Sequence, residues 1–398
     1  MATNYPTVFC HGFMGWGEND GIYKYVPYWG VFQKKNILKH LRDEGYECYA
    51  PSLGPFNSAW DRACELWAII MGGTVDYGKV HSEKYGHARF GRTYPGLIND
   101  WGTPGPHEKI NIVGHSFGGP TVLAFADLLA NGSEEERKGT PAEELSPFFL
   151  PDKKQKLHCA STLTGVLNGT TFASWLRRPG VVIVGEACLL LVSITGNSKL
   201  TRYYDFYMDH WDMMENQYER KENYLRGPFA IRKQINNYHR NFFDAIGHEM
   251  QLECMQEICK KMGPPAKETY YFAHSGDRTH YDEKRGYRMI NKDANFISKV
   301  PAILCSRWGS DYLAKNYHWN LAEWTYHDGF VNVPGQKAPF CFESIDATSF
   351  NDAFRPGIWY NLPTRENCDH LTWIGLGETA EDTFKFFDDL LKRYAELA

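Results

Sequence analysis

The sequence predicts an α/β fold in which helices cover both faces of a mostly parallel central sheet. Short apolar runs alternate with amphipathic segments of helical period along most of the chain, which is the rhythm of βαβ units. One apolar run, residues 109–113, leads through Gly114-His115-Ser116-Phe117-Gly118 into a helical segment at 120–129. With 398 residues, 43% of them hydrophobic, the chain can bury a large core as one domain with insertions.

The expected elements follow one another in the order that this fold requires. Strands are predicted at 7–10, 46–50, 109–113, 158–164, 268–275, 302–304 and 361–369, and helices at 32–44, 120–129 and 380–398. The first helix is expected to end at Gly45, because glycine accepts the left-handed conformation that closes many helices.

Two stretches break this rhythm and are predicted as insertions into the single domain 1–398. Residues 54–108 hold a helix at 60–71 and then a glycine-rich, polar stretch, too long for an ordinary connection. Residues 166–250 hold an apolar segment at 179–195 and a polar, aromatic-rich helix at 201–219. Because glycines bracket it, at 180 and 196, we expect the apolar segment to be a lid; a buried core helix is the alternative.

Ser116 lies where a nucleophile is expected in such a fold. A strand, a sharp G-x-S-x-G turn and a helix together form the nucleophile elbow, which raises the serine hydroxyl above the sheet edge. A Cβ atom at position 114 or 118 would collide with the neighbouring helix or strand. The backbone N–H of Phe117 is then directed toward a developing oxyanion, and that of Phe13, in the loop after the first strand, is its expected partner.

A nucleophilic serine needs a base, and the base needs a carboxylate that orients it. His370 is the last histidine of the chain and precedes the closing helix, where this fold class places its base. Asp328, followed by Gly329, is the best candidate for the acid, since Asp369 is adjacent to His370 and their side chains diverge. Asp346 and Glu343 are weaker rivals.

Composition excludes several other classes. The net charge of −5 argues against a basic surface for binding nucleic acid. No apolar stretch is long enough to span a membrane, and the first residues show no signal peptide. The ten cysteines form no C-x-x-C pair, so we expect neither a zinc ribbon nor a disulfide scaffold but mostly free, buried thiols in a reducing compartment or an anaerobic source.

The first insertion also carries Asp61, His81 and His87. Imidazole and carboxylate ligands suit zinc, and a complete shell of protein ligands would make the site structural. From these residues alone, the simpler interpretation is that they are ordinary solvent-exposed polar residues that bind no metal.

At this point the chain resembles a known family, the thermoalkalophilic lipases of bacterial lipase family I.5, which are α/β-hydrolases. The stretches that carry the resemblance are 11–17, 60–65, 72–78, 86–97, the motif at 114–118, 328–329 and 369–371. The resemblance implies a triad of Ser116, Asp328 and His370, and an oxyanion hole formed by Phe13 and Phe117. It also implies a structural zinc ion bound by Asp61, His81, His87 and Asp209, with Asp205 as the alternative fourth ligand.

Three positions depart from the family's pattern. Phe117 replaces the usual glutamine, which keeps the backbone N–H and makes the acyl pocket more apolar. Thr372 and Gly377 stand where the family has acidic calcium ligands, so calcium is not predicted. The stretch 164–170 lacks the family's His-Asp pair.

We therefore expect a serine carboxylic ester hydrolase, a lipase or esterase that cleaves acylglycerols or similar water-insoluble esters through an acyl-enzyme. The alternatives are a polyesterase using the same triad, a metal-dependent hydrolase centred on His81 and His87, and a non-catalytic lipid-binding module. The expected partner is the lipid substrate, contacted transiently through the lid, with no protein partner. The resemblance implies an extracellular location; the cytoplasm is the alternative.

Overall fold

A seven-stranded sheet forms the centre of the protein, and all of its neighbouring strands are parallel. The computed structural model describes residues 4–31, 33–151, 153–176, 202–211, 244–308, 313, 315 and 321–397. The strand order is β11-β12-β7-β6-β5-β1-β2. In sequence order these strands are β1 (Thr7–Cys10), β2 (Cys48–Tyr49), β5 (Lys109–His115), β6 (Lys156–Leu163), β7 (Tyr270–His274), β11 (Ser344–Asp346) and β12 (Trp359–Asn361). The predicted parallel α/β architecture is confirmed.

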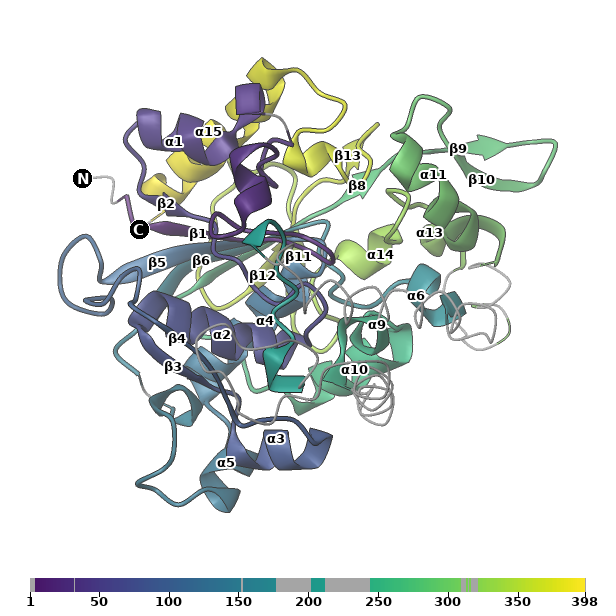
Figure 1. Cartoon of the computed structure of the whole chain (residues 1–398). Coiled ribbons are helices and arrows are strands. Elements are labelled where there is room, and N and C mark those ends of the chain that lie inside the picture. Colours follow the sequence, from purple (N-terminus) through teal and green to yellow (C-terminus); the bar gives the residue numbers. More distant parts are fainter. Residues whose placement is uncertain are drawn as a thin grey trace.

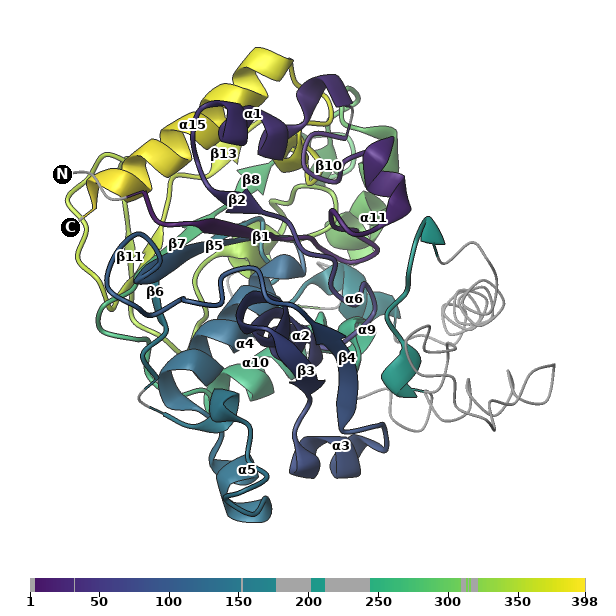
Figure 2. The same cartoon turned by 60° about the vertical axis from the view of Figure 1, so that its left-hand side comes forward.

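Helices cover both faces of this sheet (Figures 1 and 2). On one face lie α1 (Ile37–Asp43) and α15 (Ala380–Glu396), and on the other lie α2 (Ala59–Met71), α4 (Gly118–Asn131) and α10 (Leu252–Lys261). Two separate apolar cores result, because successive side chains of a strand point to opposite faces. Val8 and Cys10 belong to the core under α2 and α4, whereas Phe9 belongs to the core under α15.

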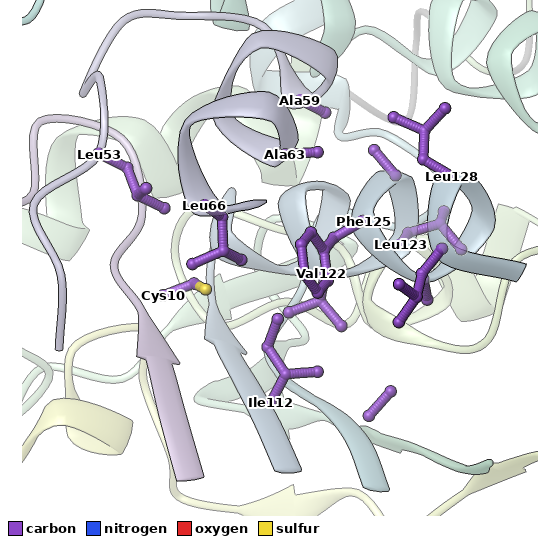
Figure 3. Packing of buried hydrophobic residues seen from close by; sticks show 14 of the residues in the cluster. Cys10, Leu53, Ala59, Ala63, Leu66, Ile112, Val122, Leu123, Phe125 and Leu128 are labelled. Carbon is purple, nitrogen blue, oxygen red and sulfur yellow. The ribbon is translucent and has the colours of Figure 1, made fainter. Parts of the chain in front are cut away.

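The core under α2 and α4 supports the end of β5 that carries the motif. Ile112 of β5 packs below Val122 and Phe125 of α4, and Leu66 of α2 lies beside them (Figure 3). These side chains are completely buried. The helix that follows Ser116 is thereby held firmly against the strand that precedes it.

The chain between β2 and β5 builds a small unit outside the central sheet. It contains α2, β3 (Gly73–Asp76), α3 (Lys79–Tyr85) and β4 (Phe90–Tyr94), and β3 pairs with β4 in an antiparallel hairpin. After α4, α5 (Glu134–Gly139) and the short helix η3 (Pro147–Phe149) pack nearby.

The second predicted insertion is described only in part. The lid segment 179–195, with its glycines at 180 and 196, and residues 212–219 of the expected polar helix lie outside the described residues. The described elements within this insertion are α6 (Thr171–Leu176), η5 (Asp209–Trp211) and α9 (Ile246–Glu249), and α10 follows it.

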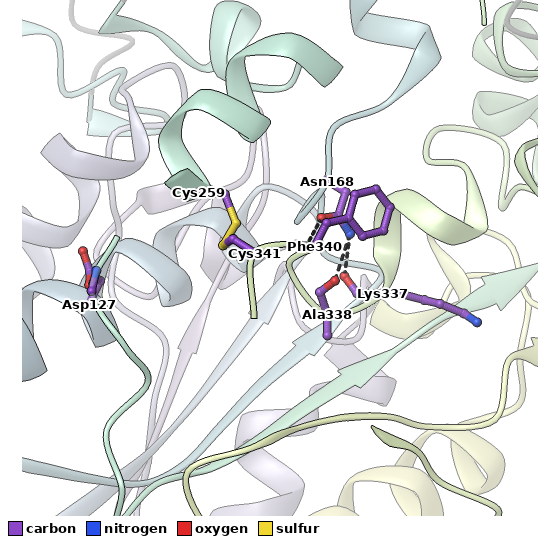
Figure 4. The surroundings of a disulfide bond; sticks show 8 residues. Asp127, Asn168, Cys259, Lys337, Ala338, Phe340 and Cys341 are labelled. Carbon is purple, nitrogen blue, oxygen red and sulfur yellow. Dashed lines mark hydrogen bonds between the residues drawn. A yellow bond between two sulfur atoms is a disulfide. The ribbon is translucent and has the colours of Figure 1, made fainter. Parts of the chain in front are cut away.

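Cys259 at the end of α10 forms a disulfide with Cys341, which the sequence analysis did not predict (Figure 4). Close to this bond, Asn168 receives the N–H of Phe340 at 2.8 Å and donates to the carbonyls of Lys337 and Ala338. The other described cysteines are free, and all of them except Cys254 are buried, as expected.

The strand expected at 302–304 is wrong. The structure has helix α11 (Phe296–Ile303) there, followed by the π-helical turn η7 (Leu304–Trp308). A three-residue apolar run cannot distinguish a strand from the buried side of a helix. The last expected strand is also split: β12 ends at Asn361 and β13 (Arg365–Glu366) pairs separately with β8 (Gly276–Asp277), on either side of Pro363, which has no N–H to donate.

The remaining elements lie around the carboxyl ends of the sheet strands. They are β9 (Thr279–Asp282), β10 (Tyr287–Ile290), α13 (Leu321–Trp324), α14 (Val333–Gln336), and the short helices η1 (Gly21–Lys24), η2 (Gln33–Lys35) and η8 (Thr372–Ile374). Within the described residues, every helix is too short or too polar to cross a bilayer.

Candidate active site and metal cluster

Ser116 occupies a strained turn between β5 and α4. Its φ is +58°, a left-handed value that residues other than glycine rarely adopt. A Cβ at Gly114 would lie 2.2 Å from the carbonyl oxygen of Gly118, and a Cβ at Gly118 would lie 2.3 Å from that of Cys10. The turn can therefore form only with glycine at both positions, and it holds Ser116 at the carboxyl end of the sheet.

Three loops bring Ser116, His370 and Asp328 together. His370 Nε2 lies 2.8 Å from Ser116 Oγ, and His370 Nδ1 lies 2.7 Å from Asp328 Oδ2. These distances suit a serine hydroxyl that donates to Nε2 and an Nδ1–H that donates to the carboxylate. Asp369, rejected as the acid, is turned away: its carboxylate accepts the backbone N–H of Asn295.

Asp328 is held as a carboxylate although it is completely buried. Burial acts to raise its pKa, but His370 and several hydrogen bonds outweigh burial and lower the pKa below the ordinary value. The N–H groups of Phe330 and Val331 donate to Oδ1, and the hydroxyl of Thr164 donates to Oδ2. Asp328 can therefore orient His370 and stabilise its positive charge.

The loop after β1 lies directly against the serine. A Cβ at Gly12 would stand 2.6 Å from Ser116 Cβ and 3.1 Å from Ser116 Oγ. Within the described part of the chain, the N–H groups of Phe13 and Phe117 have no intramolecular acceptor. Both amides are thus free to bind an oxyanion formed beside Ser116.

A buried arginine holds this loop in place. Arg62 of α2 donates to the carbonyls of His11 and Gly54 and to the hydroxyl of Thr121. Its guanidinium is completely buried, so these contacts replace the hydration that it loses.

A second buried histidine, missed by the sequence analysis, joins the same loops. The hydroxyl of Tyr28 receives the N–H of Gly12 at 3.0 Å and lies 2.6 Å from His115 Nδ1. His115 Nε2 lies 2.8 Å from the carbonyl oxygen of His370. Burial, with a smaller effect of nearby His370, lowers the pKa of His115 to about 3, so its ring is neutral. In the sequence, His115 is visible only as the residue between glycine and serine in the G-x-S-x-G motif. Nothing in the sequence indicates that it contacts Tyr28 and the loop of His370.

Four side chains of the types that bind metals gather beside α2. Asp61, His81, His87 and Asp244 offer ligand atoms that all lie within 4.8 Å of one another. Asp61 lies on α2, the histidines lie on and just after α3, and Asp244 lies two residues before α9.

The donor atoms of this cluster fit a metal ion better than they fit each other. Asp61 Oδ1 and His87 Nε2 are buried and form no well-aligned hydrogen bond among the described residues; each lies 3.3 Å from another member of the cluster, His81 Nε2 and Asp244 Oδ2 respectively. The other ring nitrogen of His87, Nδ1, lies 2.9 Å from the carbonyl oxygen of Ala88, which leaves Nε2 as the ligand atom. Unpaired buried polar atoms are costly, and a bound cation would satisfy both.

The prediction of Asp209 as the fourth ligand needs correction, because its carboxylate binds Arg92 instead of joining the cluster. Its Oδ1 accepts two hydrogen bonds from Arg92, at 3.0 and 2.7 Å, and the alternative Asp205 accepts from the same guanidinium at 2.8 Å. Both carboxylates neutralise a buried arginine, and Asp244 takes the position in the cluster. His210, next to Asp209, instead reaches Asp61 Oδ2 at 3.0 Å. In the sequence Asp244 has apolar neighbours on both sides and belongs to no recognisable ligand motif, so nothing local singled it out.

A parallel sheet with a strained serine elbow and a histidine and a carboxylate on later loops defines an α/β-hydrolase. The family model described as the lipase-like C-terminal domain matches residues 3–398, and the chain belongs to this family of bacterial lipases, of the I.5 type that the sequence analysis expected.

Named relatives agree with this assignment. A lipase of Staphylococcus epidermidis is 30% identical over 397 residues, which is 99% of this chain and 53% of that protein. Lipase 1 of Staphylococcus aureus is also 30% identical and is covered to 54% of its length. The chain thus spans about half the length of these relatives.

Solved structures match over nearly their full length. Staphylococcus hyicus lipase has a TM-score of 0.82 and 27% identity, covering 99% of this chain and 97% of that one. EstA from Clostridium botulinum has a TM-score of 0.78 and 29% identity, covering 98% and 88%. Lipase 1 from Pelosinus fermentans has a TM-score of 0.72 and 30% identity, covering both chains completely.

Proposed function

We propose that the protein is a serine carboxylic ester hydrolase that cleaves acylglycerols or similar water-insoluble esters. The observation that carries the proposal is the hydrogen-bonded series from Ser116 through His370 to buried Asp328. Its relatives, named as lipases and as EstA, support an ester as the substrate class.

The reaction follows from the positions of these groups. Ser116 Oγ attacks the ester carbonyl while His370 Nε2 takes its proton, and Asp328 stabilises the resulting imidazolium. The N–H groups of Phe13 and Phe117 donate to the oxyanion of the tetrahedral intermediate, each contributing roughly 3–4 kcal/mol. His370 then protonates the leaving alkoxide. Water, deprotonated by the same histidine, hydrolyses the acyl-enzyme and releases the fatty acid.

The metal that the family implies is zinc, and Asp61, His81, His87 and Asp244 would hold it. A zinc ion with four protein ligands acts as a structural cross-link. Here it would join α2 and α3 to the segment before α9, outside the Ser116 site. Buried Asp61 Oδ1 and His87 Nε2, which form no well-aligned hydrogen bond among the described residues, support this site.

An extracellular location is part of the proposal. The disulfide between Cys259 and Cys341 supports an oxidising compartment, since cytosolic thiols are normally kept reduced. Mass spectrometry of the protein isolated from its source, alkylated without reduction, should find this pair oxidised.

Ser116→Ala tests the function. The variant should keep its fold and lose at least about a thousandfold of p-nitrophenyl butyrate turnover. A metal-dependent hydrolase centred on His81 and His87 would instead keep most of its rate, and that result would refute the serine mechanism. If the unmodified protein binds fatty acid but hydrolyses none of a series from butyrate to palmitate esters, it is a lipid-binding module.

A further inference from the structure

Helix α11 (Phe296–Ile303) turns large apolar side chains toward the solvent. Phe296 is 81% exposed, Ile297 is 56% exposed and Ile303 is 53% exposed. We call these three residues the α11 patch. Surface helices normally present polar residues on their outer side, and contiguous exposed apolar side chains mark an interaction surface.

The opposite side of α11 packs on the loops of the active site. Ser298, completely buried, lies so close to Gly329 that a Cβ there would be 2.7 Å from Ser298 Cβ. In the turn after the helix, Cys305 Sγ lies 3.3 Å from the carbonyl oxygen of Phe330. The loop that carries Asp328 is therefore supported directly by this helix.

The N-terminal end of α11 reaches the loop of the catalytic histidine. The side-chain amide of Asn295 lies 2.8 and 2.7 Å from the two carboxylate oxygens of Asp369, and 3.3 Å from the carbonyl oxygen of Leu376. Asp369 immediately precedes His370. A single helix thus separates the α11 patch from both partners of Ser116.

The surroundings of the patch suit a lipid surface. Figure 1 shows α11 beside the β9–β10 hairpin at the edge of the molecule. Exposed Lys284 lies at the hairpin tip with Glu283 and with Arg285, whose Nε is 4.0 Å from Asp282 Oδ2, and exposed Lys292 precedes the helix. The neighbouring acid Asp293 is paired with Arg278 at 2.9 Å. Apolar side chains flanked by lysine and arginine are typical of surfaces that lie on a lipid–water interface.

We propose that the α11 patch docks the protein on the surface of aggregated lipid, with Phe296 and Ile297 inserted among the acyl chains. The proposal rests on the proposed function, because a water-insoluble ester presents such a surface. It is distinct from the lid contact expected at 179–195, since α11 lies outside that insertion. Docking through α11 brings the surface within one helix diameter of the loops that carry Asp328 and His370.

The test compares two double variants. Phe296→Ser/Ile297→Ser removes the patch, and Phe90→Ser/Leu150→Ser is the matched control, since Phe90 on β4 and Leu150 after η3 are 57% and 42% exposed. Sedimentation with phosphatidylcholine vesicles measures binding, and turnover is measured on soluble p-nitrophenyl butyrate and on emulsified triolein. The patch variant should bind vesicles about tenfold or more weakly. It should lose triolein turnover in proportion and stay within about twofold on the soluble ester, while the control should match the unmodified protein throughout.

Vesicle binding decides the proposal independently of turnover. If the patch variant binds vesicles as tightly as the unmodified protein, the proposal is wrong even when the ester activity is confirmed. If light scattering shows a dimer that only the patch variant loses, α11 is an interface between copies of the chain and the proposal is also wrong. If the unmodified protein binds vesicles through α11 but hydrolyses neither ester, the proposed function fails and the docking surface stands.

Discussion

Replacing Gly12 by alanine should lower kcat far more than overpacking alone would, at a moderate loss of stability. The added methyl group would begin 2.6 Å from Ser116 Cβ and 3.0 Å from the carbonyl oxygen of His115. Ordinary contacts of a Cβ atom begin near 3.4 Å, so the loop after β1 must retreat by about 1 Å. The φ of Gly12 is not positive, so the backbone itself accepts alanine and the effect is purely steric.

The retreat displaces the N–H of Phe13, one of the two proposed oxyanion donors. Loss of one such donor lowers kcat by about a hundredfold to a thousandfold, which corresponds to ~2.7–4 kcal/mol. KM should change little, because the donor acts mainly on the tetrahedral intermediate. Overpacking should lower the free energy of unfolding by about 1–3 kcal/mol.

The assay is steady-state hydrolysis of p-nitrophenyl butyrate, with thermal unfolding measured in parallel. Gly139→Ala is the matched control, because its Cβ would lie 2.3 Å from Val80 Cγ2, a contact between α5 and α3 that involves none of the residues around Ser116. The control should lose stability and keep its kcat. A Gly12→Ala enzyme with kcat within about threefold of the unmodified protein would refute the assignment of Phe13 to the oxyanion hole.

Three further changes test other parts of the structure. Tyr28→Phe leaves the N–H of Gly12 and the buried Nδ1 of His115 without the hydroxyl that they share. In denaturation experiments the free energy of unfolding should fall by about 1–3 kcal/mol. In steady-state assays kcat should fall by about tenfold at nearly constant KM. Elemental analysis should find one zinc per chain in the unmodified protein and in Asp209→Asn but none in Asp244→Ala, and a chelator should lower Tm more than the initial rate; an immediate loss of rate at unchanged Tm would make the metal catalytic. Burial lowers the pKa of His274 to about 3, below its value near 6.5 in an unfolded chain, so the stability that its neutral ring contributes is complete above pH 6.5 and is lost as the pH falls through 6.5 toward 3. His274→Phe should therefore reduce the loss of unfolding free energy between pH 7.5 and 5 by about 2 kcal/mol in urea titrations, and equal pH dependence of the two proteins would contradict the burial of a neutral ring.

Local signals predicted the parts of this molecule that depend on a few adjacent residues. Gly114, Ser116 and Gly118 specify the turn, because only glycine fits at positions 114 and 118. This requirement is contained in five consecutive residues. The order of strands and helices is equally local, since a period of two or 3.6 residues is visible within one segment. His370 and Asp328 could be proposed because chain order in this fold class limits the choice to late loops.

Contacts between distant segments were the source of the errors. Asp209 and Asp244 are both acidic residues of the second insertion, and which of them reaches His81 depends on where Arg92 lies. The short apolar run at 302–304 has the same composition in a strand as at the end of α11 and the start of η7, where the structure places it. The pairing of Cys259 with Cys341 spans 82 residues and has no local signature.

The sequence by itself therefore determined the fold class and indicated the proposed nucleophile and the candidates for its partners, because steric fit and hydrophobic period act between neighbours in the chain. Only the tertiary structure decided which carboxylate completes the candidate metal cluster. It also decided that His115 links the loops around Ser116 through Tyr28, and that α11 exposes apolar side chains on the side opposite to the loops of Asp328 and His370. Those outcomes depend on how segments separated by as many as 255 residues pack together. A buried charge takes whichever partner that packing brings within hydrogen-bond distance.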